Sequence, residues 1–451
     1  MKRWHREHLW GIPGRWSYYA LFIIPFLPGR WQWYAAGWLL SLSLLWWRRT
    51  FRLTRHRLTV KRGLIWQRTT HIPLALLTTL TVERPLWMRL TGAARVAADT
   101  DAGNHRMADI RLIVKRRLAG LFLPDNTGST QYGIPIARLL LLAVLSSDSL
   151  GGILLLAALL RRGSILLGQR LEQKVWQNLE YAAEAVAQIP RAAAIITLLL
   201  ILGWLTGTVR HLLRHIPFAL CRQRDTITIY SGWLTRRIHC CAIGAINYSD
   251  HRRTLTAHLL GLTTVYLNCT GYGKDKNTLA VLIPPCRPKQ AEQEQKKLLA
   301  DMVPVPLTLR PGHGAGWRYL RLPLLLLFML PLLTGGLCRL FPHWQDLITH
   351  LAVLAATPCL WWLAVRWMDR RQAGIGYADG RYTLCYSRRL TLHQVTIPSH
   401  KIALTQVRQT PWQRYRGRCD LLVFTNHEFR RPHRVRHLPI KEVNKTILSF
   451  A

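Results

Sequence analysis

The sequence predicts an α+β membrane protein with six transmembrane helices in three pairs. Each pair is followed by a small antiparallel β domain that ends in a C-terminal helix. Three observations predict this class: apolar stretches come in pairs, strand-like segments follow each pair, and the same residues recur at fixed offsets. The 451 residues have 49% hydrophobic content but a mean hydropathy of only +0.06, so much of the chain is expected outside the lipid. This apolar content excludes an intrinsically disordered protein.

The apolar stretches are long enough to predict membrane spans. They pair as 18–27 with 31–47, 139–160 with 192–212, and 320–341 with 347–367. A helix needs about 20 apolar residues to cross a bilayer, so the first stretch is short and is expected to tilt or re-enter. Trp and Tyr residues gather at the ends of these stretches, as in the aromatic belts of membrane interfaces. The stretch at 139–160 is interrupted by serines around Asp148, where the helix is expected to start, kink or leave the membrane.

Charge predicts the orientation of these spans. The chain carries 62 Lys and Arg against 22 Asp and Glu, a net charge of +40. About sixteen of the basic residues lie in 48–135, whereas the predicted hairpin tips near Arg30 and Pro342 carry almost none. Cytoplasmic loops are enriched in Lys and Arg, so both termini and the β domains are expected in the cytoplasm. The segment 161–190 is expected to face outward as an amphipathic surface helix.

Nine cysteines without a Cys-x-x-Cys pair indicate reduced thiols in a reducing compartment.

Fixed offsets indicate a threefold repeat. A shift of 169 positions places Gly63 on Gly232 and Gly92 on Gly261 without a gap, and a shift of 325 places Gly92 on Gly417 and Pro73 on Pro398. Agreement at several positions under one offset is typical of an internal repeat. The predicted boundaries are 1–50 for a basic segment and first membrane hairpin, 51–136 for the first β domain, 137–215 for the second membrane pair, 216–304 for the second β domain, 305–370 for the third pair and 371–451 for the third β domain.

The order of these motifs resembles a known bacterial family. The motifs are 60–68 with Ile72-Pro73, the Gly232–Arg237 strand pair, 260–265, 271–274 followed by 282–285, and 318–323. Together with the membrane pairs they resemble the bacterial membrane-flanked pleckstrin-homology-like (PH-like) family, and within it the YdbT-like members with three such domains. The resemblance implies a PH fold in each β domain, a multi-pass location in the bacterial cytoplasmic membrane and a role in envelope physiology. Some family members are linked with tolerance of antimicrobial peptides, and the resemblance implies no established reaction.

The sequence offers little for catalysis or metal binding. Gly271-x-Gly-Lys274 looks like a phosphate loop, but a strand rather than a helix is expected after it, which favours a hairpin turn. His5 and His8 lack the spacing of a His-Glu-x-x-His metal motif. Carboxylates are scarce, and Glu83 is expected to form ion pairs with arginines. The predictions are therefore no enzyme, no cofactor and no metal.

The basic residues around the first turn of each β domain are the candidate functional residues. One interpretation is that they are retention charges; the sharper one is that they hold each domain against anionic lipid headgroups, at about 1 kcal/mol per residue. The predicted partners are anionic membrane lipids and a shorter sibling PH-like protein; nucleic acid is not expected, because no nucleic-acid module accompanies the charge. The candidate lipid- or partner-binding residues are Lys61, Arg62, Arg68, Arg236, Arg237, Arg388 and Arg389, and the structural repeat markers are Gly63, Gly92, Gly232, Gly261, Pro398 and Gly417.

These features predict a non-enzymatic scaffold or sensor at the membrane, in envelope stress or antimicrobial-peptide tolerance. The alternative is a transporter or exporter of a membrane-active compound that uses Asp148 or Arg210 in its pathway, because a carboxylate inside a membrane indicates function by default.

Overall fold

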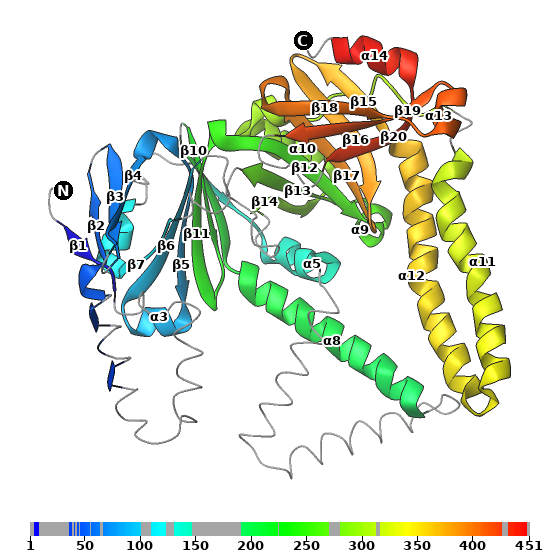
Figure 1. The fold of residues 1–451 in the computed structure, drawn as a ribbon, viewed down its shortest axis with the longest axis horizontal. Coiled ribbons are helices and arrows are strands. Elements are labelled where there is room, and N and C mark those ends of the chain that lie inside the picture. The colour runs from blue at the N-terminus through cyan, green and yellow to red at the C-terminus, as the bar shows by residue number, and fades with distance from the viewer. Residues whose placement is uncertain are drawn as a thin grey trace. The chain divides into compact units, whose positions relative to one another are not determined.

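The protein is described from a computed structural model (Figure 1). The residues described are 4–8, 36–37, 40, 43–44, 46–54, 56–63, 66–100, 110–122, 130–146, 191–223, 225–269, 280–312, 316–425 and 432–448. They form an α+β structure with antiparallel sheets, as predicted. The chain divides into two compact units. Unit 1 comprises Met1–Gly133, Ile216–Ile246 and Asn268–Ala280, and unit 2 comprises Ile134–His215, Asn247–Leu267 and Val281–Ala451.

The same succession of elements occurs three times along the chain: three strands, a 3-10 turn, a fourth strand, a short helix, two strands and a closing helix. In the first series these elements are β2 (Thr50–Leu53), β3 (Arg57–Arg62), β4 (Arg68–Pro73), η3 (Leu74–Leu76), β5 (Leu77–Pro85), α3 (Leu86–Leu90), β6 (Ala93–Thr100), β7 (Ile110–Lys115) and α4 (Arg116–Ala119).

The second and third series use the offsets seen in the sequence. In the second they are β9 (Phe218–Gln223), β10 (Thr226–Ser231), β11 (Thr235–Ala242), η5 (Ile243–Ala245), β12 (Ile246–Thr254), α9 (Leu255–Leu259), β13 (Thr263–Cys269), β14 (Ala280–Cys286) and α10 (Pro288–Leu298). In the third they are β15 (Gly374–Ala378), β16 (Arg381–Arg388), β17 (Thr391–Pro398), η9 (Ser399–Lys401), β18 (Ile402–Arg408), α13 (Pro411–Tyr415), β19 (Arg418–Thr425), β20 (His433–Pro439) and α14 (Ile440–Leu448). The short helices begin at 86, 255 and 411, which are spaced by 169 and 156 residues.

Strand pairing joins successive series edge to edge. In unit 1 a seven-stranded sheet runs β7-β6-β5-β11-β10-β9-β8, so β5 of the first series pairs with β11 of the second (β8 is Thr130–Gly133). In unit 2 a six-stranded sheet runs β14-β13-β12-β17-β16-β15, so β12 of the second series pairs with β17 of the third. The outer sheets are β1-β2-β3-β4, with β1 at His5–Arg6, and β18-β19-β20. The predicted domain at 216–304 therefore contributes residues to both units.

Each unit has its own apolar core. In unit 1, alternating residues of β3, β5, β6 and β7 meet around Leu58, Val82 and Leu112, each at most 1% exposed. In unit 2, strands β16, β17, β19 and β20 bury Leu384, Val395 and Leu421 in the same way. Period-two burial on one face of each sheet produces these cores. All nine cysteines are free thiols in the structure, and seven are buried.

Among the residues that the structure describes, one pair of helices is suited to crossing a membrane, where the sequence predicts three pairs. Helices α11 (Gly316–Leu340) and α12 (Gln345–Gln372) flank a 3-10 turn, η8 (Pro342–Trp344), and are long and apolar enough to span. In helix α8 (Arg191–His215), the apolar part found among the described side chains is 198–210, which is shorter than a membrane span. Helix α5 (Ile136–Ser146) is described only as far as the serine-rich break. Most of the first predicted pair lies outside the described residues, and so does the whole of 147–190, including Asp148.

The first turn of each series contains a residue with positive φ, and the three series provide it in two ways. Gly63 and Gly232 have φ values of +116° and +91°, which favour glycine because it lacks a Cβ. In the third series Arg388 stands at the glycine position and pairs directly with Thr391, so Arg389 and Leu390 alone form the turn. Arg389 takes the left-handed conformation there, with φ +52°. The hairpin is thus kept with a shorter turn.

His437 on β20 predicts a pH dependence for unit 2. Its backbone is left-handed (φ +58°), its Nδ1 accepts from Gln413 Nε2 at 3.1 Å, and burial lowers its pKa from 6.5 to about 4. Arg318, Arg436 and Arg418 add to this lowering, while Asp420 opposes it. A depressed histidine pKa means that the unfolded state binds the proton first, so stability should fall as pH decreases from about 6.5 to about 4. His437→Asn should flatten the melting temperature across this window, since Asn tolerates the left-handed backbone. An unchanged slope would contradict this role.

Candidate membrane-contact and anion site

A groove opens where β5 and β11 meet in unit 1. Its volume is about 290 Å³. It lies beside the β10–β11 turn, the first turn of the second series, and its polar lining comes from the arginines at the ends of both strands and from β10. The lining residues are Val82, Arg84, Pro217, Ala219, Tyr230, Ser231, Gly232, Arg236, Arg237 and Ile238. The strand junction brings Arg84, which is distant in sequence, opposite Arg236.

The groove has excess positive charge. Glu83 lies 3.2 Å from Arg237 and 3.6 Å from Arg95, so its carboxylate is shared between two arginines. Arg84 forms no such ion pair with the described residues, and its buried Nε lacks a hydrogen-bond acceptor. Burial, with Arg116 and Arg236 close by, lowers the pKa of Arg84. A cationic site with an unsatisfied buried donor favours binding of an anion.

Apolar side chains surround the groove on the surface of unit 1. Trp233 and Leu234 on the turn are 61% and 45% exposed, and Arg89 Nη1 donates to the carbonyl of Trp233 at 3.3 Å. That bond ties the turn to α3, where Leu90 is 90% exposed and Trp87 is 41% exposed. An exposed apolar patch beside arginines is typical of a membrane-interface surface.

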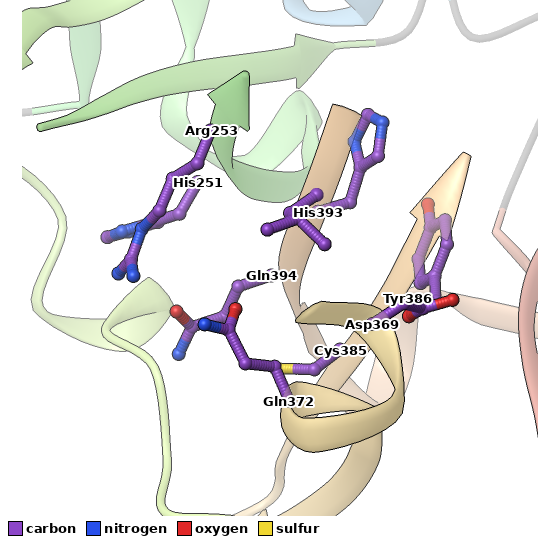
Figure 2. A pocket seen from close by; sticks show the side chains of 9 residues that line it. His251, Arg253, Asp369, Gln372, Cys385, Tyr386, His393 and Gln394 are labelled. Carbon is purple, nitrogen blue, oxygen red and sulfur yellow. The ribbon is translucent and has the colours of Figure 1, made fainter. Parts of the chain in front are cut away.

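The corresponding position in unit 2 is nearly closed, and the chain itself supplies an anion there. The pocket at the β12–β17 junction holds only about 30 Å³. Figure 2 shows its lining, which includes Arg253 and His251 of β12, Tyr386 of β16 and Asp369 of α12. The Asp369 carboxylate accepts from Ser387 Oγ at 2.6 Å and from Arg366 Nη1 at 3.3 Å.

Comparison of the two junctions indicates what the open groove can bind. The offsets place Ser231, Tyr230 and Arg84 of the groove at the positions of Ser387, Tyr386 and Arg253. Leu213 stands 156 residues before Asp369, so the second series has no carboxylate at that position. Of the two side chains that donate to Asp369, Ser387 has its counterpart, Ser231, in the groove, and the sequence offers the groove no carboxylate at the position of Asp369.

In unit 2 the part of the β domain near its first turn and short helix contacts α12, a helix suited to crossing a membrane. Leu255 of α9 and Leu392 of β17 pack with Val365 of α12 in one buried cluster, and Trp361 and Met368 lie against it. Exposed Arg389 and Leu390 form the neighbouring turn, and exposed Arg388 ends β16 beside it. The turn and short-helix end of this sheet thus lies beside the end of α12.

The structure separates the predicted site residues into two groups. Arg236 and Arg237 share the groove, and Arg68, Arg388 and Arg389 are exposed at their turns. Two are engaged within the protein: Lys61 Nζ lies 4.5 Å above the Trp4 ring, and Arg62 donates to buried Glu7 at 2.9 Å.

Sequence reasoning missed Arg84 and the exposed aromatic side chains of the turns. Trp66, Trp233 and Trp87 stand out in the sequence as tryptophans, but only strand pairing brings Arg84 to the turn of the next series.

Other candidates receive no support. The segment around Gly271–Lys276 lies outside the described residues, and the elements on either side of it, β13 and β14, are both strands, as a hairpin requires. Within the described part of the chain, no group of three metal-ligating side chains occurs. As predicted, Glu83 forms ion pairs with arginines.

Comparison with known proteins agrees with this architecture. No curated protein and no solved structure matches the chain. Residues 15–121 match the family model of the bacterial PH domain. This segment contains the first series, which is thus similar to the bacterial PH domain family.

Proposed function

We propose that this protein is a non-enzymatic, membrane-associated PH-like scaffold or sensor that binds anionic phospholipid headgroups in the groove of Arg84, Arg236 and Arg237. The observation that carries the proposal is the groove itself: three arginines, the buried Nε of Arg84 without an acceptor and a serine hydroxyl, at a position where unit 2 uses its own carboxylate. A phosphate diester offers the same acceptor oxygens as Asp369, and guanidinium groups bind phosphate in a bidentate manner.

The surroundings of the groove favour a lipid over a free anion. Trp233, Leu234 and Leu90 are exposed next to it and would insert at headgroup depth, where Trp is enriched in membrane proteins. Each basic residue near an anionic surface contributes about 1 kcal/mol. The apolar anchors and the charged groove would therefore act on the same lipid surface.

The wider role follows from the three series. A protein with three PH-like domains fixed at the cytoplasmic face of a bacterial inner membrane would report on, or protect, that leaflet during envelope stress or exposure to antimicrobial peptides. A shorter PH-like sibling is the proposed protein partner.

Lipid-dependent stabilisation of the full chain tests this function. In a neutral detergent, phosphatidylglycerol should raise the melting temperature more than phosphatidylcholine, and salt should reduce the difference. The double variant Arg84→Gln/Arg236→Gln should need about thirtyfold more phosphatidylglycerol for the same shift, because it lacks two charges of about 1 kcal/mol each. Its stability without lipid should be unchanged or higher, since two crowded cations are removed.

Arg57→Gln is the matched control, because Arg57 is exposed in the same unit at the end of β3 away from its turn. It should respond to phosphatidylglycerol as the unmodified protein does. Equal stabilisation by the two lipids, or a full response in the double variant, would refute headgroup binding in the groove.

A further inference from the structure

The two strand junctions between series share one register. At the first, Arg237 of β11 lies opposite Glu83 of β5, and at the second, His393 of β17 lies opposite Arg252 of β12. Through the repeat offsets of 169 and 325, Arg237 and His393 both correspond to Arg68 of β4. Through the offsets of 325 and 156, Glu83 and Arg252 both correspond to Arg408 of β18. The chain thus builds the same antiparallel junction twice, with no slip between the two copies.

The strands that would form a third junction are both sheet edges. β4 ends the sheet β1-β2-β3-β4, and β18 ends the sheet β18-β19-β20; neither has a second neighbour strand among the described residues. β18 keeps the shape of its counterpart β5: both carry a register shift after their first residue, at Ile402/Leu404 and at Leu77/Thr79. Leu404 is 56% exposed on this edge. An open edge shaped like an edge that is already paired can accept another strand.

The free strand edges differ from the paired edges in the charged residues that they carry. Each junction is closed by a carboxylate: Glu83 lies 3.2 Å from Arg237, and Asp250 lies 2.5 Å from Arg252 and 3.0 Å from His393. In β18 the residue that corresponds to Glu83 is Arg408, and the residue that corresponds to Asp250 is Gln406. A second copy would therefore place Arg68 opposite Arg408 with no acid between them, and like charges directly opposite are destabilising.

We propose that the outer edge of β18 is a docking edge for an antiparallel strand of a partner protein that carries a carboxylate opposite Arg408. Arg68, at the corresponding position of this chain's own β4, disfavours a second copy at that edge. The partner is thus defined by its chemistry: an exposed strand with the β4 register and an Asp or Glu at that position. This docking edge is independent of the lipid groove, since none of its residues lines that groove.

Charge reversal turns the chain into its own partner and tests the edge. Light scattering of the full chain in detergent should show monomers for the unmodified protein. Arg68→Glu supplies the missing carboxylate, and self-association should strengthen at least tenfold. Arg408→Glu creates the same pair with the charges exchanged and should have the same effect, which protects the test against one variant failing to fold.

Two further variants complete the design. The double variant Arg68→Glu/Arg408→Glu restores like charges and should return to monomers, and Arg57→Glu, a reversal away from the edge, should stay monomeric. If neither single reversal self-associates, β18 is not a docking edge. If the unmodified chain associates as strongly as Arg68→Glu, or if the double variant remains associated, the charge pair does not control docking.

Discussion

Asp250→Asn should lower the free energy of unfolding of unit 2 by about 3–5 kcal/mol. Asp250 is 2% exposed, and its carboxylate holds Arg252 from its own strand and His393 from β17. Arg252 also stacks on Tyr266, with its Cζ 4.5 Å from the ring centroid. Loss of the negative charge leaves a buried guanidinium uncompensated at the junction between the second and third series. Chemical or thermal unfolding of the purified chain measures the loss.

The pH dependence of this variant separates charge from packing. Arg252 and His393 hold the pKa of Asp250 well below its usual range. A depressed carboxyl pKa contributes stability above the unfolded-state pKa of about 3.9, and that contribution is lost as pH falls below this value. The gap between Asp250→Asn and the unmodified protein should therefore be full at pH 7 and shrink in acid.

A surface pair in the same unit provides the control. Asp379 lies 3.0 Å from Arg381, but its side chain is 81% exposed. Asp379→Asn should cost about 0–1 kcal/mol, because solvent screens exposed ion pairs. A similar small loss for Asp250→Asn would show that the junction does not depend on its carboxylate.

The elements inside each series could be predicted from the sequence because they depend on local signals. Alternation in β3 and β10 marks strands, and Gly63 and Gly232 mark turns that need positive φ. The elements recur at fixed offsets because the same local signals occur three times in the sequence. The third turn was the exception, since Arg389 adopts a glycine-like conformation.

The partners of the charged residues could not be predicted, because they depend on pairing between distant strands. Arg62 is a basic residue of the kind that binds lipid headgroups, yet its guanidinium donates to Glu7, 55 residues earlier in the chain. Arg84 has no distinguishing context in the sequence and becomes part of the groove only because β5 pairs with β11. Composition gives the sign of the charge, and strand pairing decides which charges remain available.

Asp369→Ala should destabilise unit 2 by about 3–5 kcal/mol and make its stability depend on added anion. Asp369 is 3% exposed, Arg366 is 7% exposed, and Ser387 Oγ donates to the same carboxylate. Removal of the side chain leaves Arg366 buried without its counter-charge and opens space for a small carboxylate. The pocket then acquires the character of the open groove in unit 1: donors and a guanidinium without an acceptor.

Acetate or formate should restore part of the lost melting temperature of Asp369→Ala, at concentrations that leave the unmodified protein unchanged. Asp369→Asn fills the same space and should show no such rescue, and Asp379→Ala should respond to neither anion. Rescue would show that this junction selects for a negative group, which is the chemistry proposed for Arg84 and Ser231 in the second series. Failure of rescue in a folded Asp369→Ala protein would remove the internal precedent for anion binding, and the groove would then depend on lipid binding data alone.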